Sequence, residues 1–132
     1  MISFTVPGDP VPWERARLGA GGHVTAPRTR KWQDKIKHHA LNAIHPKDRR
    51  QEGPVSIRMR FWRETRRACD WDNLAKSVCD ALNGIAYEDD SQIDIALVTR
   101  GVDPHFPRVE IEITHHDAPQ RPEGRLLPEI EP

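Results

Sequence analysis

The sequence predicts a small single domain of the α/β (α+β) class, in which a mixed β-sheet packs against two helices. Three observations lead to this prediction. Four short segments alternate apolar and polar residues, which is the pattern of strands with one buried face. Two longer segments repeat their apolar residues at helical spacing. The six segments follow one another as strand, helix, strand, helix, strand, strand, and 132 residues suit one domain.

The four predicted strands span residues 2–6, 55–62, 93–100 and 108–114. Proline and glycine residues directly after the first strand end it. The second strand is the clearest, because its apolar side chains occupy every other position: Val55, Ile57, Met59 and Phe61. The same alternation in the last two strands predicts that they join the same sheet.

Each predicted helix has one apolar stripe. The first helix is capped by Thr25 or Thr29 and runs to about Ile44, with a stripe made of Trp32, Ile36, Ala40 and Ala43. The second helix starts at Asp72, which we expect to be its N-cap, and runs to about Ala86. Its stripe consists of Leu74, Val78, Ala81, Leu82 and Ile85.

The formal net charge is zero, but the charges are divided unevenly along the chain. Residues 1–69 hold 15 Lys or Arg against 6 Asp or Glu, whereas residues 70–132 hold 5 against 14. The zero sum therefore does not exclude nucleic acid as a partner, because the basic half alone would attract phosphates.

Several classes of protein are not expected. No segment has the ~20 apolar residues of a membrane span, and the N-terminal residues lack the pattern of a signal peptide. Cys69 and Cys79 are the two cysteines, without CxxC or paired Cys/His spacing, so neither a zinc site nor a disulfide framework is expected. Reduced thiols in a bacterial-type cytoplasm fit this usage.

Acidic residues at two places suggest a metal site. In an extended chain, Asp70 and Asp72 would point the same way while Trp71 points inward, and Lys76 lies one helical turn further on. Glu88, Asp89 and Asp90 form the turn before the next strand. Converging carboxylates without Cys or His favour Mg²⁺ or Mn²⁺. An ordinary helix cap, an i,i+4 ion pair and a solvated turn would leave the same pattern, so the spacing leaves both interpretations open.

The combined string resembles the RusA family of Holliday junction resolvases from bacteria and their phages. The residues that carry the resemblance are Asp70-Trp-Asp72-Asn73-Leu74, then Lys76, then Asp80-Ala81-Leu82, then Asp89-Asp90 before a strand. The resemblance covers roughly residues 2–114 and implies a RusA-like fold. It implies an Mg²⁺-dependent endodeoxyribonuclease, with Mn²⁺ as a substitute, that acts as a homodimer on four-way DNA junctions in recombination and repair.

The resemblance also implies roles for individual residues. Asp70, Asp72 and Asp90 match the family's catalytic, metal-binding aspartates, and Lys76 matches its catalytic lysine. Asp90 is preferred to Asp89 because the second aspartate of the pair is the family's catalytic one. Asn73 matches a position that could support the site, and Asp80 is interpreted as a structural or neighbouring residue.

A symmetry argument favours a dimer independently. Resolving a junction takes two cuts related by a two-fold axis, and each chain would supply one active site. The candidate interfaces are the exposed faces of the strands and Trp13 or Trp62.

We expect the basic half to bind the DNA backbone. For any single arginine, an ordinary position on the solvated surface is an equally good interpretation. The candidate DNA-binding residues are Arg15, Arg17, Arg28, Arg30, Lys31, Lys35, Arg66 and Arg67, with Arg63 as a further possibility. Arg66 and Arg67 are favoured because they lie so close in sequence to Asp70. The glycine-rich segment 19–22 lacks the Lys-Ser/Thr ending of a P-loop and is expected to be a mobile loop.

Two alternatives to a resolvase remain: a protein that binds branched DNA without cutting it, and a nuclease for flaps or other branched DNA. Aspartates facing phosphates would not help a pure binder, and the Asp72 to Lys76 spacing does not match the pattern of restriction-type nucleases. The expected domain covers residues 1–114, followed by a flexible, proline-rich tail at 115–132. No membrane, no small-molecule cofactor and a cytoplasmic location in a bacterium or phage-infected cell are expected.

Overall fold

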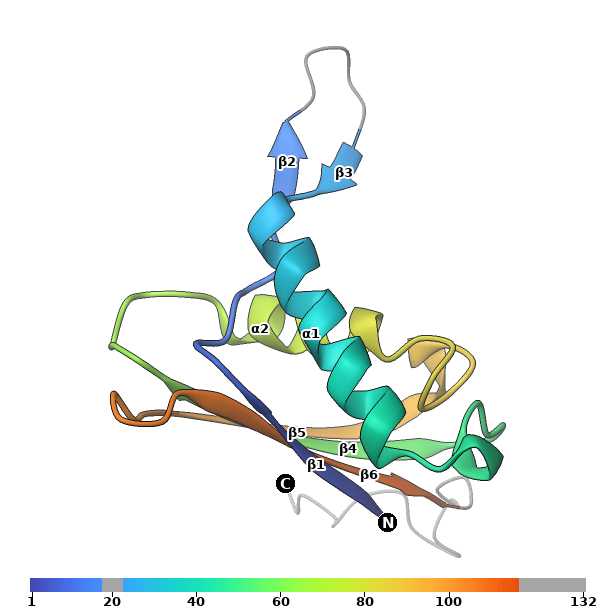
Figure 1. The fold of residues 1–132 in the computed structure, drawn as a ribbon. Helices are drawn as coiled ribbons and strands as arrows, with labels where there is room; N and C mark the ends of the chain where they lie inside the picture. Colours follow the sequence, from blue (N-terminus) through green and yellow to red (C-terminus); the bar gives the residue numbers. More distant parts are fainter. Residues whose placement is uncertain (18–22, 117–132) are drawn as a thin grey trace, which may run out of the picture.

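A four-stranded sheet with the order β1-β6-β4-β5 forms the base of the fold (Figure 1). The computed structural model describes residues 1–17 and 23–116. The strands of the sheet are β1 (Ile2–Pro7), β4 (Val55–Arg63), β5 (Ile93–Val102) and β6 (Arg108–His115). The predicted glycine-rich loop and all but the first two residues of the predicted tail lie outside the described residues.

The sheet is mixed, as predicted. Strand β4 pairs in parallel with β5 and antiparallel with β6, and β6 pairs antiparallel with β1. The parallel pairing follows from the helix between β4 and β5, because a crossover returns the chain to the same end of the sheet. Its register shifts between Val55 and Ser56, so that Asp94 is an extra residue opposite this step.

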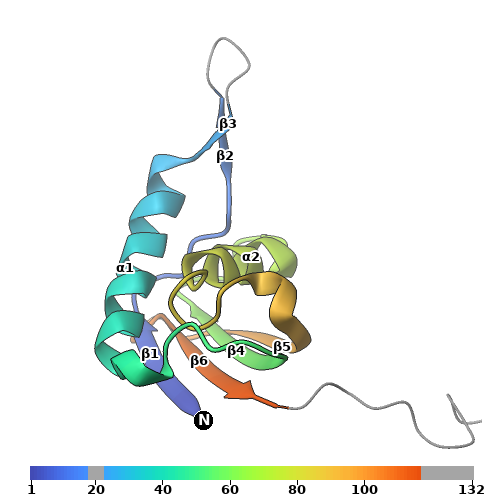
Figure 2. The ribbon, with the colours of Figure 1, turned by 90° about the vertical axis from the view of Figure 1, so that its right-hand side faces the viewer.

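Helices α1 (Pro27–Ala43) and α2 (Trp71–Ala81) cover one face of the sheet (Figure 2). The predicted stripes face the sheet, and Ile36, Leu74 and Val78 are fully buried against the core residues of β4 and β6. Short 3₁₀ turns η1 (Pro46–Asp48) and η2 (Asp90–Gln92) precede β4 and β5. Within the described part of the chain, neither helix has the length and apolar character to cross a membrane.

The expected helix ends need correction. Helix α1 begins after Ala26, and Thr29 is buried within it, where its hydroxyl accepts from Glu14 N (3.1 Å) and donates to the Pro12 carbonyl (2.9 Å). Helix α2 has Asp70 rather than Asp72 at its N-cap position. It ends at Ala81 rather than Ala86, because the chain turns at Gly84, whose φ of +76° favours glycine.

The early start of α2 reverses the expectation for Trp71. As the first residue of the helix it does not point inward, and it is 54% exposed. Asp70 and Asp72 therefore lie on the first turn of a helix and not along an extended segment.

A second, two-stranded sheet was not expected. Strands β2 (Arg15–Arg17) and β3 (His23–Thr25) pair antiparallel and extend away from the rest of the chain beyond the start of α1 (Figure 1). Three residues per strand are too few for a recognisable alternation.

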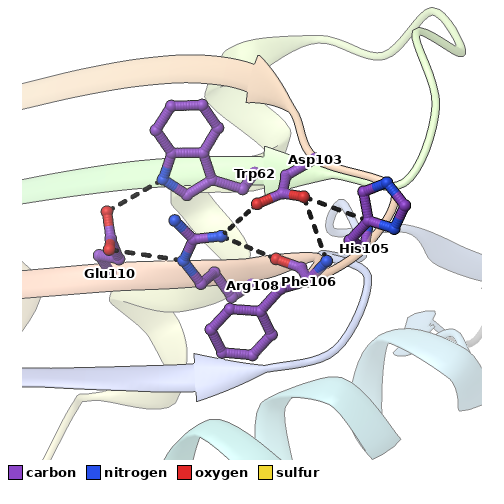
Figure 3. A network of polar contacts seen from close by, with 6 residues as sticks. All are labelled: Trp62, Asp103, His105, Phe106, Arg108 and Glu110. Carbon is purple, nitrogen blue, oxygen red and sulfur yellow. Dashed lines mark hydrogen bonds and ion pairs between the residues drawn. The ribbon is translucent and has the colours of Figure 1, made fainter.

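The sheet face opposite the helices carries a network of polar contacts (Figure 3). Arg108 donates to Asp103 (2.9 Å) and Glu110 (3.4 Å), and its guanidinium lies 5.2 Å from the Trp62 ring centroid and 4.8 Å from that of Phe106. Trp62 Nε1 also donates to Glu110 (2.9 Å). These contacts tie β4, β6 and the β5–β6 loop together, and they engage one of the two tryptophans considered for a dimer interface.

Candidate active site

One face of α2 carries a row of charged side chains. Asp72, Lys76 and Asp80 are four residues apart, so they lie on the same side of the helix at steps of about 6 Å. Leu74 and Val78, on the other side, are fully buried. The predicted division of the helix into a core face and a charged face is therefore confirmed.

Lys76 has two partners beside this row. Its Nζ lies 3.2 Å from Asp80 Oδ2 and 4.9 Å from the centroid of the Trp13 ring. Trp13 is held in place by its backbone N–H, which donates to the Asn73 carbonyl (2.9 Å). Asn73 thus helps to position Lys76 through its backbone, and an aromatic face limits the directions in which the ammonium can move.

Asp90 reaches this row from η2. Its carboxyl group lies close enough to that of Asp80 for the two to influence each other's ionisation. Burial and this neighbouring carboxyl raise the pKa of Asp90 above its ordinary value; the charge of Asp89 acts in the same direction and Lys76 opposes it. Asp80, Asp90 and Lys76 therefore form one electrostatic unit in which two carboxyl groups compete for a proton or a cation.

The adjacent carboxyl of Asp89 has a different task. It is the N-cap of η2, where it accepts from Ser91 N (2.9 Å), while the Gln92 side chain accepts from the Asp89 backbone N–H (3.0 Å). The hydrogen bonds from Ser91 lower the pKa of Asp89. Asp89 is thus used to shape the turn, and Asp90 is the member of the pair that faces α2.

Asp70 and Asp72 stand at the start of the same helix. The Asp70 side chain makes no capping hydrogen bond, and Asp72 Oδ1 accepts from Asn73 N (2.9 Å). Within residues 1–17 and 23–116, no three His, Cys, Asp or Glu side chains are grouped closely enough to hold a metal ion as they stand. The structure therefore brings Lys76, Asp80 and Asp90 together. Asp70 and Asp72 lie toward the N-terminal end of the same helix.

The donor set is compatible with Mg²⁺. Every candidate ligand is a carboxylate, which is the donor that hard divalent cations prefer. Burial, and after it the neighbouring carboxyl groups of Asp80 and Asp89, raise the pKa of Asp90. A bound cation would stabilise the ionised carboxylate against both effects.

A basic cavity of about 690 Å³ opens next to Asp70. Arg66 and Arg67 line it together with Asp70, as their separation in the sequence predicts. Arg63 and Arg100 line it as well, and Arg100 Nη1 donates to the Cys69 carbonyl (2.6 Å). Arg63 donates to the Arg67 carbonyl in the same wall. Arg100 was not among the predicted DNA-binding residues, because only the parallel pairing of β5 with β4 brings it to this place.

The other predicted basic residues are more dispersed. Arg28 lines a neighbouring cavity of about 470 Å³ and pairs with Glu14 (3.6 Å), and Arg15 lies 5.7 Å from the Trp13 ring centroid. The α1 residues Arg30, Lys31 and Lys35 are exposed and line neither cavity. Arg17 lies in β2, and only its backbone is described.

Tyr87 is fully buried in the core, and Cys79 packs against the core beside it. The Tyr87 hydroxyl donates to the Cys79 carbonyl (2.7 Å), and burial raises the pKa of both groups, that of Cys79 to about 12. Both cysteines are free thiols. Cys79 packs against the core and its thiol is held in the neutral form, so it is not a nucleophile.

Comparison with known proteins assigns the chain to a family. A search of curated proteins found no match to the chain. The family model of the endodeoxyribonuclease RusA matches residues 7–114, which include both helices, the basic cavity and every aspartate of the candidate site. The chain therefore belongs to the RusA family of endodeoxyribonucleases.

Proposed function

We propose that this protein is an Mg²⁺-dependent nuclease that resolves Holliday junctions by two symmetric cuts in DNA recombination and repair. The observation that carries the proposal is the row of acidic residues and Lys76 on α2, with Asp90 packed against it and a cavity of arginines at its end. Membership of the RusA family supports the same conclusion.

Asp70, Asp72 and Asp90 would hold the Mg²⁺, for which Mn²⁺ could substitute. When bound, the metal would supply an activated water and neutralise charge on the scissile phosphate. A metal ligand must be the ionised carboxylate, and the nearby Lys76 ammonium favours that form of Asp90 by opposing the rise in its pKa.

Lys76 would stabilise the negative charge that develops on the phosphate oxygens. The ring of Trp13 and the carboxylate of Asp80 keep its Nζ on the side of α2 that carries the aspartates. The Lys76 ammonium needs little reorganisation during the reaction, because its partners already hold it in place.

The arginines of the cavity would bind the DNA backbone. The cavity that Asp70 borders is also lined by Arg63, Arg66, Arg67 and Arg100, so a strand held by these side chains would have its phosphates next to the start of α2. Such contacts make affinity depend on salt but not on sequence. They suit an enzyme that acts on the shape of DNA in the cytoplasm of a bacterium or a phage-infected cell.

Two active sites are needed for two cuts, so we propose that the enzyme acts as a homodimer. One chain carries a single set of the proposed catalytic residues. A two-fold axis would relate the two sets just as it relates the two strands that are cut.

The test uses a four-way junction, a flap and a linear duplex built from the same labelled strands, each incubated with Mg²⁺, Mn²⁺ or EDTA. We expect paired nicks at symmetric positions in the junction, dependent on metal. Tight binding without cleavage in either metal would identify a DNA-binding protein, and preferred cleavage of the flap would identify a different nuclease. Either result would contradict the proposal.

Variants separate the roles of neighbouring carboxylates. Asp70→Asn, Asp72→Asn and Asp90→Asn should each lower the cleavage rate at least a hundredfold while junction binding in EDTA is kept. Asp89→Asn is the matched control, since asparagine can still cap η2 and the residue does not face α2. Mn²⁺ binding, followed by electron paramagnetic resonance, should weaken in Asp90→Asn and not in Asp89→Asn.

A further inference from the structure

The exposed apolar side chains of the protein are concentrated on one edge of the sheet. The large hydrophobic residues exposed in the described chain are Met1, Leu41, Trp71, Ile95, Leu97, Val102 and Phe106. Ile95 (52% exposed), Leu97 (47%) and Val102 (37%) belong to β5, and Trp71 lines a shallow cavity of about 410 Å³ with Ala96, Leu97, Val98 and Arg100. A patch of this kind on an otherwise charged surface is typical of a protein–protein contact.

The apolar side chains of Ile95 and Leu97 in β5 do not pack into the core of this chain. Ile95 and Leu97 pair with Ser56 and Arg58 of β4, which lie on the sheet face opposite the helices. The neighbouring strands fill that face with ion pairs, such as those that join Arg58 and Arg60 to Glu112. An apolar row beside these charges is therefore left without a partner from the described residues.

Strand β5 also has an open backbone edge. It borders the sheet, so only its β4 side is hydrogen-bonded within the described chain. Edge strands usually carry lysine or proline, which discourage pairing with another chain. The ten residues of β5 include neither, whereas the opposite edge strand, β1, has six residues and ends in Pro7.

The charges of β5 are self-complementary. Its one acidic residue, Asp94, and its one basic residue, Arg100, lie three positions on either side of Leu97. A two-fold axis perpendicular to the sheet at Leu97 would set two copies of β5 antiparallel. In this register Asp94 of each copy stands opposite Arg100 of the other, and opposite charges across a strand pair stabilise it.

We propose that a second copy of this chain binds along β5, with the two-fold axis at Leu97. The two four-stranded sheets then join into one continuous sheet. On the face away from the helices, Ile95 and Leu97 of both copies form one apolar row. On the helix face, Trp71 lies over the junction next to Ala96 and Val98.

This interface deepens the proposed dimeric resolvase and rests on it. It also places the candidate sites near the axis, because Arg100 lines the cavity that contains Asp70. Asp94 of the second copy stands opposite Arg100, so each copy borders the basic cavity of the other. The two active sites would face the DNA from either side of one axis.

Cysteine cross-linking tests the register. In a Cys69→Ser, Cys79→Ala background, Leu97→Cys places two thiols on directly opposed residues, about 4.5–5.5 Å apart at Cα, within the range for a disulfide. Ile95→Cys is the matched control: it lies on the same strand and face, yet it is opposed to Thr99 and stands four residues, roughly 13 Å, from its own copy. Mild oxidation should cross-link Leu97→Cys at least tenfold faster.

Charge exchange tests the contact independently of any cysteine. Sedimentation equilibrium should give twice the 15.1 kDa mass for the native chain. Asp94→Arg and Arg100→Asp should each raise the dimer dissociation constant at least tenfold, and the double variant should restore it. Circular dichroism of each variant verifies that the fold is kept.

The outcomes separate this inference from the proposed function. A native chain that is monomeric at 100 μM, or cross-linking at Ile95 in place of Leu97, would overturn the interface even if junctions are still cut. A dimer with the expected cross-links that fails to cut any DNA would uphold the interface and contradict the nuclease.

Discussion

Replacement of Arg108 by alanine tests whether the network of Figure 3 holds the β5–β6 region together. Arg108 is the hub of that network: two carboxylates and two aromatic rings contact its guanidinium, and its side chain is 16% exposed. Arg108→Ala removes every one of these contacts and leaves Glu110 with one donor, the indole of Trp62.

The expected loss of stability follows from the contacts. Each cation–π contact contributes about 0.5–1 kcal/mol, and the partly exposed pair with Glu110 about 0.5–1 kcal/mol. Their sum gives a destabilisation of about 2 kcal/mol, to which the loss of the Asp103 pair adds. For a domain of this size, 1 kcal/mol corresponds to about 3–5 °C, so the Tm should fall by about 6–10 °C.

Arg60→Ala is the matched control. Arg60 lies on the same face of the sheet, but it makes a single ion pair with Glu112 at 3.7 Å, and its side chain is 37% exposed. We expect a change of at most about 0.5 kcal/mol. Differential scanning calorimetry measures the Tm of both variants. Equal Tm values for Arg108→Ala and Arg60→Ala would refute the reasoning.

The same network predicts a dependence on pH. The hydrogen bond from Arg108 lowers the pKa of Asp103, and those from Trp62 and Arg108 lower that of Glu110, so both are more acidic in the folded state. Their contribution to stability is complete above the ordinary values of 3.8 and 4.5, and is lost as the pH falls through the lower folded-state values. Stability of the native protein should therefore fall more steeply below about pH 4.5 than that of Arg108→Ala.

Three further changes have defined outcomes. Gly101→Ala should destabilise the protein by about 1–3 kcal/mol in urea, because the added Cβ would lie 2.6 Å from the Trp62 ring. Thr29→Val should cost about 1–3 kcal/mol, since it leaves the partly buried Glu14 N–H and Pro12 carbonyl, in the segment leading to β2, without their hydrogen-bond partner. Asp80→Asn should lower the pKa of Asp90, followed by carboxyl ¹³C NMR without metal, because a repelling charge is removed.

Each of these expectations has a contrary result. An unchanged urea midpoint in Gly101→Ala would mean that Trp62 moves aside freely. A loss below 0.5 kcal/mol in Thr29→Val would mean that water replaces both hydrogen bonds. A higher pKa of Asp90 in Asp80→Asn would mean that Asp80 stabilises the ionised form of Asp90 in the native protein, against the repulsion expected here.

The strands and the helical stripes were predictable because burial imposes a period on the sequence. Val55, Ile57, Met59 and Phe61 alternate because one face of β4 meets the helices, and Leu74 and Val78 recur because α2 turns once in 3.6 residues. The apolar stripe of α2 continues past its end, however. Leu82 and Ile85 are buried from a turn, so periodicity alone extended the helix too far.

The site was predictable where its residues are close in sequence and not where pairing brings them together. Asp72 and Lys76 share a helix face, and Arg66, Arg67 and Asp70 share a loop. Arg100 joins them through the parallel pairing of β4 with β5, and Asp80 meets Asp90 through the turn that leads into β5. Neither contact leaves a periodic signal.

The position of β6 has a consequence for how the protein is made. This strand comes last among the described residues, yet it lies in the interior of the sheet and hydrogen-bonds to β1 on one side and β4 on the other. The pairing of Ile2 with Ile113 spans nearly the whole domain. The core therefore cannot close before the residues of β6 have been synthesised, although β1 and β4 leave the ribosome earlier. Until then, β1 and β4 present unpaired edges to the cell, and chaperone binding to the nascent chain would be most useful during that interval.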